Sequence, residues 1–179
     1  MSILSQDDIR RAVDEGHLQF SPTLEEAQWG PASIDLRLGL QFTKLKSADG
    51  VRFSVADGLK ALGSTGLWIT DEYGKDTFDK QKAFTLEPNE FVLATTYESI
   101  RIPPHLIALV EGRSTYARVG LSMHQTAPWI QPGWSGPIIL EIRNSGPLHI
   151  DLCPIKDRPC QITFFELSSK LDENVAYGS

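Results

Sequence analysis

The N-terminal stretch carries the clearest helical pattern in the chain. Ser5 can cap a helix, and Asp8, three residues later, occupies the matching position of a capping box. Ile9 and Val13 then fall on one face, and Gly16 follows as a stop signal. The pattern predicts a short N-terminal helix that ends before Gly16.

Beyond this helix the apolar positions gather in short runs, and turn-forming residues separate the runs. Pro, Gly and Asn recur at intervals too short for the long amphipathic helices of a βαβ fold. Many short strands at such spacing are typical of a β-sandwich or β-barrel. The sequence therefore predicts a mainly β fold, with strands expected at residues 33–40, 91–96, 106–110, 138–142 and 161–167.

Residues 43–83 give the weakest pattern, because they are polar and dotted with glycine. We expect a loop-rich insertion there, with one or two hairpins. No internal repeat, low-complexity tract or linker interrupts the sequence. Residues 1–179 are therefore expected to form a single domain.

A second short helix is expected at residues 115–119, and the residues around its start are chemically the richest in the chain. Gly112 permits a tight turn before it, and Ser114 can cap it. N–H groups at the helix start, the Arg113 guanidinium and the Ser114 and Thr115 hydroxyls can together hold an anion such as a phosphate chain. A capped surface helix whose arginines face solvent explains the same residues equally well.

Charge and hydropathy narrow the possible partners. The 179 residues carry 17 Lys and Arg against 23 Asp and Glu, so the formal net charge is −6. An acidic chain lacks the positive surface of a general nucleic-acid binder, and a nucleic-acid polymer is not expected as a partner. No apolar run reaches the roughly 20 residues of a membrane span. The first residues lack the basic and apolar regions of a signal peptide, so we expect a cytoplasmic protein.

The common signatures of enzyme chemistry are absent from the sequence. It contains no glycine-rich dinucleotide or P-loop motif, no G-x-S-x-G elbow and no H-E-x-x-H pair. The zinc-deaminase pattern also fails, because Pro159 and Cys160 are not followed by the second cysteine of P-C-x-x-C. The four histidines are scattered, at positions 17, 105, 124 and 149. We therefore expect no zinc site.

Several segments, read together, resemble the dCTP deaminase branch of the trimeric dUTPase superfamily. Any one of them is weak evidence, but the combined pattern is specific, and the likeness covers about residues 1–170. The segments are Ser-Ile-Asp-Leu-Arg-Leu-Gly at 33–39, Pro-Asn-Glu-Phe-Val-Leu-Ala at 88–94, Gly-Arg-Ser-Thr-Tyr-Ala-Arg at 112–118, His-Gln-Thr-Ala at 124–127, Pro-Gly-Trp-Ser-Gly at 132–136 and Leu-Glu-Ile at 140–142.

This resemblance implies a distorted jelly-roll or β-barrel of the dUTPase-like type, assembled as a homotrimer with active sites where subunits meet. It also implies hydrolytic deamination of dCTP to dUTP and ammonia, which supplies dUTP for the synthesis of dUMP and dTTP. No metal would act at the deamination centre. Mg²⁺ would bind through the nucleotide triphosphate.

The resemblance assigns catalytic roles to individual residues. The family's catalytic glutamate corresponds to Glu141, and the backbone carbonyl of Ala127 would help to hold the attacking water. Ser114 and Arg118 would orient the carboxylate and that water. One carboxylate can carry every proton transfer at C4, from water to the ring nitrogen and then to departing ammonia. Taken alone, Glu141 reads as an outward strand residue paired with Arg143.

The same resemblance assigns further residues to the substrate. Those at the start of the second helix would bind the triphosphate, and the backbone of the His-Gln-Thr-Ala segment would read the edge of the base. Trp134 is either a packing residue or an aromatic wall near the sugar, and Asp35 is expected to organise the subunit interface. The full substrate set is Arg113, Ser114, Thr115, Gln125, Thr126, Gln131 and Trp134.

Gln131 departs from the family pattern and bears on the product. Many relatives, including bifunctional enzymes that also hydrolyse the triphosphate, have aspartate at this position. Glutamine is not a base at neutral pH, so it cannot activate a water aimed at the α-phosphate. We therefore expect dUTP as the product. The alternatives are a bifunctional enzyme that forms dUMP and pyrophosphate, and an inactive nucleotide-binding regulatory homologue.

Overall fold

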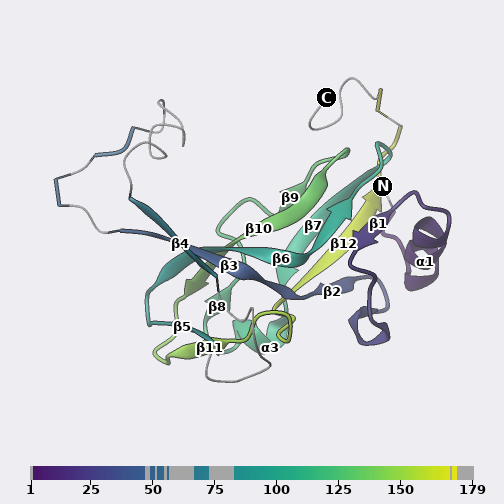
Figure 1. Cartoon of the computed structure of the whole chain (residues 1–179). Coiled ribbons are helices and arrows are strands. Elements are labelled where there is room, and N and C mark those ends of the chain that lie inside the picture. The colour runs from purple at the N-terminus through teal and green to yellow at the C-terminus, as the bar shows by residue number, and fades with distance from the viewer. Residues whose placement is uncertain are drawn as a thin grey trace.

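Antiparallel β-sheets make up most of the fold (Figure 1). The computed structural model describes residues 2–46, 49–50, 52–54, 56, 67–72, 83–169 and 171–172. Within these residues the largest sheet has the strand order β4-β3-β6-β10-β8, and β1 also pairs with β6. Its strands are β1 (Gln19–Ser21), β3 (Leu38–Leu45), β4 (Trp68–Glu72), β6 (Phe91–Arg101), β8 (Leu121–Ser122) and β10 (Ser135–Asn144).

A second sheet and a small third one complete the strands of the described residues. The second sheet has the order β2-β12-β7-β9, and β5 pairs with β11 in the third. Inward side chains from all three sheets form one apolar core, in which Leu86, Ile142 and Phe164 are fully buried. The strands are β2 (Ile34–Leu36), β5 (Phe84–Leu86), β7 (Leu106–Gly112), β9 (Trp129–Ile130), β11 (Ile150–Leu152) and β12 (Cys160–Glu166).

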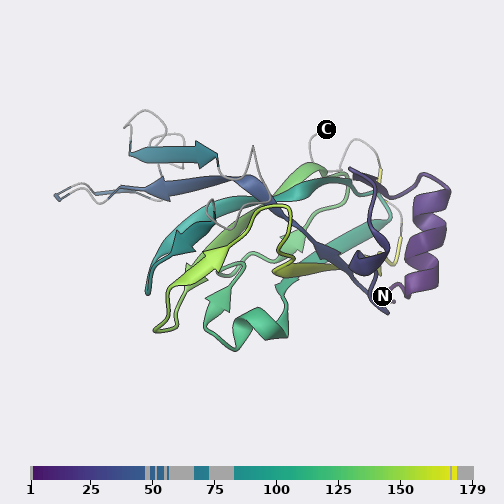
Figure 2. The same ribbon diagram turned by 60° about the horizontal axis from the view of Figure 1, so that its bottom comes forward.

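Helix α1 (Gln6–Asp14) confirms the predicted N-terminal helix. The Ser5 hydroxyl accepts a hydrogen bond from the Asp8 N–H, and the Asp8 carboxylate accepts one from the Ser5 N–H, so the capping box is complete. The Ser5 hydroxyl also donates to the Asp8 carboxylate at 2.6 Å, and this bond, together with the one from the Ser5 N–H, holds the pKa of Asp8 below its usual value. Gly16 ends the segment with a φ of 74°. The helix lies at the opposite end of the molecule from β4, as Figure 2 shows.

The predicted strands are confirmed, and most are longer than the apolar runs that suggested them. The run at 91–96 continues to Arg101 as β6, where buried and partly buried side chains alternate along the strand. The run at 33–40 is divided at Arg37 into β2 and β3. A mainly β fold with a short N-terminal helix is therefore confirmed.

A buried ion pair lies at the break between β2 and β3. The Glu98 carboxylate, fully buried on β6, accepts hydrogen bonds from the Arg37 Nε at 2.7 Å and from the Arg37 backbone N–H at 2.9 Å. The amide of Gln28, in the short 3₁₀ helix η1 (Glu26–Gln28), donates to the same carboxylate at 2.9 Å. Each buried polar group is thereby satisfied, as a buried charge requires.

Two expectations need correction, and a third falls partly on residues that the structure does not describe. The sheets of the described residues do not close into a barrel. The second helix, α3 (Ser114–Ala117), begins one residue and ends two residues earlier than predicted, because Arg113 rather than Ser114 is its N-cap. In the insertion at 43–83, β3 and β4 form an antiparallel pair. Residues 47–48, 51, 55, 57–66 and 73–82 of that insertion lie outside the described residues.

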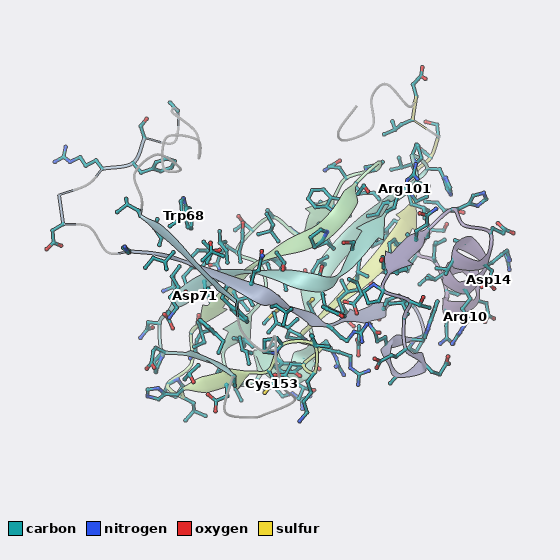
Figure 3. The ribbon with its side chains drawn as sticks, in the orientation of Figure 1. Arg10, Asp14, Trp68, Asp71, Arg101 and Cys153 are labelled. Atoms are coloured by element: carbon teal, nitrogen blue, oxygen red, sulfur yellow. The ribbon has the colours of Figure 1, made fainter. Side chains whose placement is uncertain are left out.

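Polar and charged side chains cover the outside of the molecule, including Arg10 and Asp14 on α1 and Asp71 on β4 (Figure 3). Arg10 also lies over the ring of Trp29, with its guanidinium carbon 4.1 Å from the ring centroid. In the part of the chain that the structure describes, we find no helix with the length and apolar character needed to span a membrane.

Candidate active site

Glu141 lies on the outward face of β10, between the buried residues Leu140 and Ile142. Its side chain is half-buried, and one carboxylate oxygen accepts a hydrogen bond from the Gln125 backbone N–H at 3.0 Å. The Gln125 side-chain amide donates to the Glu141 backbone carbonyl at 3.1 Å. Read alone, Glu141 is expected to pair with Arg143, but its contacts in the described part of the chain are with Gln125. The carboxylate therefore has a fixed position beside the segment that follows β8.

The segment between β8 and β9 is held at both ends and exposed in the middle. The Glu141 N–H donates to the Met123 carbonyl at 3.0 Å, and the Val110 N–H donates to the Pro128 carbonyl at 2.9 Å. Met123 is buried in the core. Residues 125–127, which include Thr126 and Ala127, are exposed between these anchors. Their backbone groups are therefore accessible to a ligand next to Glu141.

His124 lies next to the candidate site, and sequence reasoning did not include it among the site residues. Its Nε2 lies 3.1 Å from a carboxylate oxygen of Glu111, at the end of β7. Its Nδ1 is buried and makes no hydrogen bond with the described part of the chain. The histidine precedes Gln125 directly, so its ring helps to fix the segment that contacts Glu141. The residue type alone does not distinguish a core histidine from a histidine near a site. The sequence feature that could have pointed to His124 is its place in the His-Gln-Thr-Ala motif.

Helix α3 presents polar side chains to the surface, with Ser114, Thr115 and Arg118 all exposed. Arg113, the N-cap residue of α3, contacts other parts of the chain. One of its guanidinium nitrogens lies 3.1 Å from an Asp35 carboxylate oxygen and donates to the Arg158 carbonyl at 3.1 Å. Burial raises the pKa of Asp35, while Arg113 and Arg158 oppose that rise. Arg113 and Asp35 thus tie α3 to β2 within one chain.

The two halves of the predicted catalytic set are separate in one chain. Among the described residues, neither Ser114 nor Arg118 forms a hydrogen bond or ion pair with Glu141, whose carboxylate contacts the Gln125 N–H. Glu141 belongs to the central sheet, and the other two residues lie on α3 or directly after it. Within one chain, therefore, Ser114 and Arg118 do not form an assembled constellation with Glu141.

Gln131 and Trp134 lie in the turn that precedes β10, at the far end of that strand from Glu141. The Trp134 N–H donates to the Gln131 carbonyl at 3.2 Å. Along a strand, each residue adds about 3.3 Å, so roughly 20 Å of strand separate this turn from Glu141. Gln131 is exposed, whereas the Trp134 indole packs against the core and donates to the Gly136 carbonyl at 3.1 Å. Trp134 thus has a packing role.

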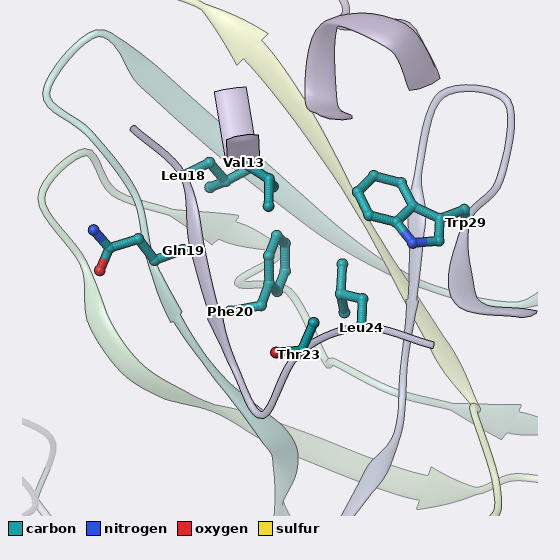
Figure 4. Close-up of a pocket in the computed structure, with 7 residues that line it drawn as sticks. All are labelled: Val13, Leu18, Gln19, Phe20, Thr23, Leu24 and Trp29. Atoms are coloured by element: carbon teal, nitrogen blue, oxygen red, sulfur yellow. The ribbon is translucent and has the colours of Figure 1, made fainter. Parts of the chain in front are cut away.

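No group of three or more His, Cys, Asp or Glu side chains among the described residues is arranged to hold a metal ion. A pocket of about 210 Å³ lies between α1 and β1, and Figure 4 shows its lining. The lining is mostly apolar and contains none of the predicted site residues. It consists of Val13, Leu18, Gln19, Phe20, Thr23, Leu24 and Trp29.

Comparison with solved structures identifies the class of fold. A 2′-deoxycytidine 5′-triphosphate deaminase from Agrobacterium tumefaciens matches 96% of this chain with a TM-score of 0.68 and 23% identity. The match spans half of that longer chain (50%). The native EIAV dUTPase matches 88% of this chain and 98% of its own, with a TM-score of 0.51 and 17% identity. The chain has a dUTPase-like fold.

Sequence comparison then gives the family within that class. The model of the dCTP deaminase-like family matches residues 3–167. A "dCTP deaminase, dUMP-forming" from Methanosphaera stadtmanae is 40% identical over 170 residues, which cover 94% of this chain and 81% of the relative. A dCTP deaminase from Natronomonas pharaonis is 41% identical over 169 residues, covering 93% and 82%. This chain belongs to the dCTP deaminase-like family, as its motifs predict.

Proposed function

We propose that this protein deaminates dCTP hydrolytically to dUTP and ammonia. The observation that carries the proposal is the Glu141 carboxylate, held at 3.0 Å by the Gln125 N–H beside an accessible backbone segment. The names of relatives at 40% and 41% identity support the substrate. The product dUTP would supply the synthesis of dUMP and dTTP. A cytoplasmic location stays a prediction from the sequence.

The chemistry requires one group that moves protons around C4 of cytosine. Glu141 takes a proton from water as the water oxygen attacks C4, and passes that proton to N3. The tetrahedral intermediate then loses its hydroxyl proton to Glu141, which delivers it to the amino group. The C4–N bond breaks, ammonia leaves and the C4 carbonyl forms. The Ala127 carbonyl would hold the attacking water, and the backbone at Gln125 and Thr126 would read the edge of the base.

The triphosphate is assigned to α3 and its N-cap. Ser114 and Thr115 expose hydroxyl groups there, and the Arg113 guanidinium has further N–H groups besides those that contact Asp35 and Arg158. A helix of four residues has little dipole of its own, so these side chains would carry the binding. Mg²⁺ would reach the site on the triphosphate. Gln131 of a neighbouring subunit would accept a hydrogen bond from the sugar 3′-hydroxyl, because roughly 20 Å of strand separate Gln131 from Glu141 within one chain.

A homotrimer would bring the two halves of the predicted catalytic set together. Ser114 and Arg118 of one subunit would then orient the Glu141 carboxylate of a neighbour. Exposed apolar side chains near the site suit such an assembly: Trp129 on β9 is 46% exposed and Ile139 on β10 is 60% exposed. Burying them against a second copy would remove apolar area from water.

The test of this function is a parallel assay with dCTP, dUTP, CTP and dCMP, in which ammonia and pyrophosphate are measured separately. Ammonia release from dCTP is expected. A second candidate, the bifunctional reaction to dUMP and pyrophosphate, is favoured by the dUMP-forming name of the Methanosphaera stadtmanae relative. Nucleotide binding without ammonia release would instead identify a regulatory homologue.

Arg118→Ala is expected to lower kcat/KM for dCTP by about 100-fold, the size seen when one hydrogen-bond donor is removed from an oxyanion hole. The loss of its guanidinium leaves the carboxylate without a charge-assisted partner. Because Arg118 is exposed, the melting temperature should stay close to that of the wild type. Arg11→Ala, on the surface of α1, is the matched control and should retain full activity. Wild-type kinetics in Arg118→Ala would contradict the assignment.

The shared site predicts subunit complementation. Chains with Glu141→Gln and chains with Arg118→Ala, each nearly inactive, are unfolded together and refolded in equal amounts. About a quarter of the interfaces would then combine an intact Glu141 with an intact Arg118 from the next subunit, and activity should rise well above either parent. Light scattering on the wild type should give a trimer. A fully active monomer of 19.9 kDa would refute the shared site.

A deamination centre without metal predicts a specific response to chelators. Metal analysis of the purified protein should give no stoichiometric zinc. Chelation should lower activity only as far as it removes Mg²⁺ from the triphosphate, so excess Mg²⁺ should restore the rate fully. Zinc near one equivalent per chain, with activity that only zinc restores, would overturn this mechanism.

A further inference from the structure

Backbone hydrogen bonds hold helix α3 at both ends. None of its four residues is fully buried, and Tyr116 is the residue of the helix whose side chain packs, partly buried, against the core. At the N-terminal end the Arg113 N–H donates to the Pro159 carbonyl at 2.9 Å. Beyond the C-terminal end the Gly120 carbonyl accepts from the Ser145 N–H at 2.8 Å. The second anchor belongs to the turn that follows β10, the strand that carries Glu141.

Two glycines allow this second anchor to be very close. Gly120 has a φ of 92°, and a Cβ placed on it would lie 2.3 Å from the Gly146 nitrogen. A Cβ on Gly146 would lie 2.1 Å from the Val119 carbonyl oxygen. Both distances are far below van der Waals contact. A side chain at either position would therefore push the end of α3 away from the turn.

Asn144 gives that turn its shape. The residue is fully buried, and its side-chain amide donates to the Leu148 carbonyl at 2.7 Å and to the Leu86 carbonyl at 3.2 Å. Its side-chain oxygen accepts from the Gly146 N–H at 3.0 Å. Both amide hydrogens and the oxygen are therefore used, and the backbone of Gly146 is held in one place.

We propose that Asn144, acting through Gly146 and Gly120, is a positioning residue that sets the place of α3 relative to the strand carrying Glu141. Asn144 lies three residues after Glu141 and pairs with Leu121 of β8, directly after the α3 segment. The inference rests on the proposed function, because α3 is there assigned to the triphosphate. A displaced α3 would weaken the grip on the triphosphate and leave the contacts to the base intact.

The test compares Gly146→Ala with Gly39→Ala. Both add a Cβ against backbone, at 2.1 Å from the Val119 carbonyl and at 2.8 Å from the Thr95 carbonyl, but Gly39 lies on β3, away from α3. Binding of dCTP and dCMP is measured below the melting range of each variant. In Gly146→Ala the preference for dCTP over dCMP should fall at least about tenfold, the size expected for one lost hydrogen bond to a charged group. Gly39→Ala should keep the wild-type preference.

Asn144→Ser is the second variant, because it removes the two amide donations without a steric clash. Hydrogen exchange of the backbone amides at 117–120 should be faster in Gly146→Ala and in Asn144→Ser than in the wild type. Exchange within β6 should stay as in the wild type. The positioning role would be overturned if a folded variant kept the wild-type preference for dCTP over dCMP. It would also be overturned if the amides at 117–120 of that variant exchanged at the wild-type rate. If the wild type itself shows no preference for dCTP, the triphosphate assignment fails, and the exchange rates still decide whether Asn144 positions α3.

Discussion

Glu141→Gln should abolish ammonia release from dCTP while changing the affinity for dCTP by less than about tenfold. The substitution keeps a side-chain oxygen that can accept the Gln125 N–H, which now donates to the carboxylate at 3.0 Å. The local geometry and the contacts to the base should therefore survive. An amide cannot take up and return protons at neutral pH, so the transfers from water to N3 and to the leaving ammonia all stop.

The matched control for this experiment is Glu87→Gln. Glu87 pairs with His149 on the surface, away from the predicted site, and its carboxylate has the same chemistry. Ammonia release by Glu87→Gln should equal that of the wild type. Binding of dCTP by Glu141→Gln is measured by calorimetry, and turnover by an enzymatic ammonia assay. Activity above a few per cent of the wild-type rate in Glu141→Gln would remove this residue from the proton-transfer role.

The parts of the fold that could be predicted depend on local signals. The capping box of Ser5 and Asp8 and the stop at Gly16 involve neighbours in sequence, so α1 could be located to within a residue. The apolar runs and the turn residues between them are likewise local, and they predicted parts of β6, β7, β10 and β12. The ends of these strands were less accurate because pairing partners, rather than local pattern, decide where a strand stops.

The buried ion pair could not be predicted, because its members lie far apart in sequence. Arg37 and Glu98 are 61 positions apart, and Glu98 occupies an inward position of β6 between Thr96 and Ile100. The alternation along β6 places the Glu98 carboxylate in the core. The sequence alone does not show that Arg37 is the partner of this carboxylate, so it does not explain the break between β2 and β3.

The candidate site residues come from motifs in the sequence, whereas their arrangement in space could not be predicted from it. Resemblance in motifs pointed to Glu141 and Arg118, yet the Gln125 N–H as the partner of Glu141 depends on how β8 and β10 pair. The proposed positioning of α3 by Asn144 depends on a turn that is distant in sequence, because Asn144 follows Gly120 by 24 residues. Such long-range contacts leave no periodic signal.

We propose that Gln131 decides which nucleotide leaves the enzyme. The residue is exposed in the turn before β10, at the far end of that strand from Glu141, so deamination and any hydrolysis of the triphosphate would use different groups. Relatives of similar identity carry different names: the one from Methanosphaera stadtmanae is called dUMP-forming, and the one from Natronomonas pharaonis is not. The names of these relatives therefore do not distinguish dUTP from dUMP as the product of this chain.

Wild-type enzyme is expected to accumulate dUTP, and Gln131→Asp is expected to add some release of pyrophosphate. Glutamine can accept a hydrogen bond from the sugar hydroxyl but cannot deprotonate a water at the α-phosphate, whereas aspartate can do both. Gln131→Asn keeps the amide and is the control, so it should form dUTP alone. Nucleotides are separated by chromatography while ammonia is followed in parallel. If wild-type enzyme free of phosphatase forms dUMP in step with ammonia, another group must activate that water.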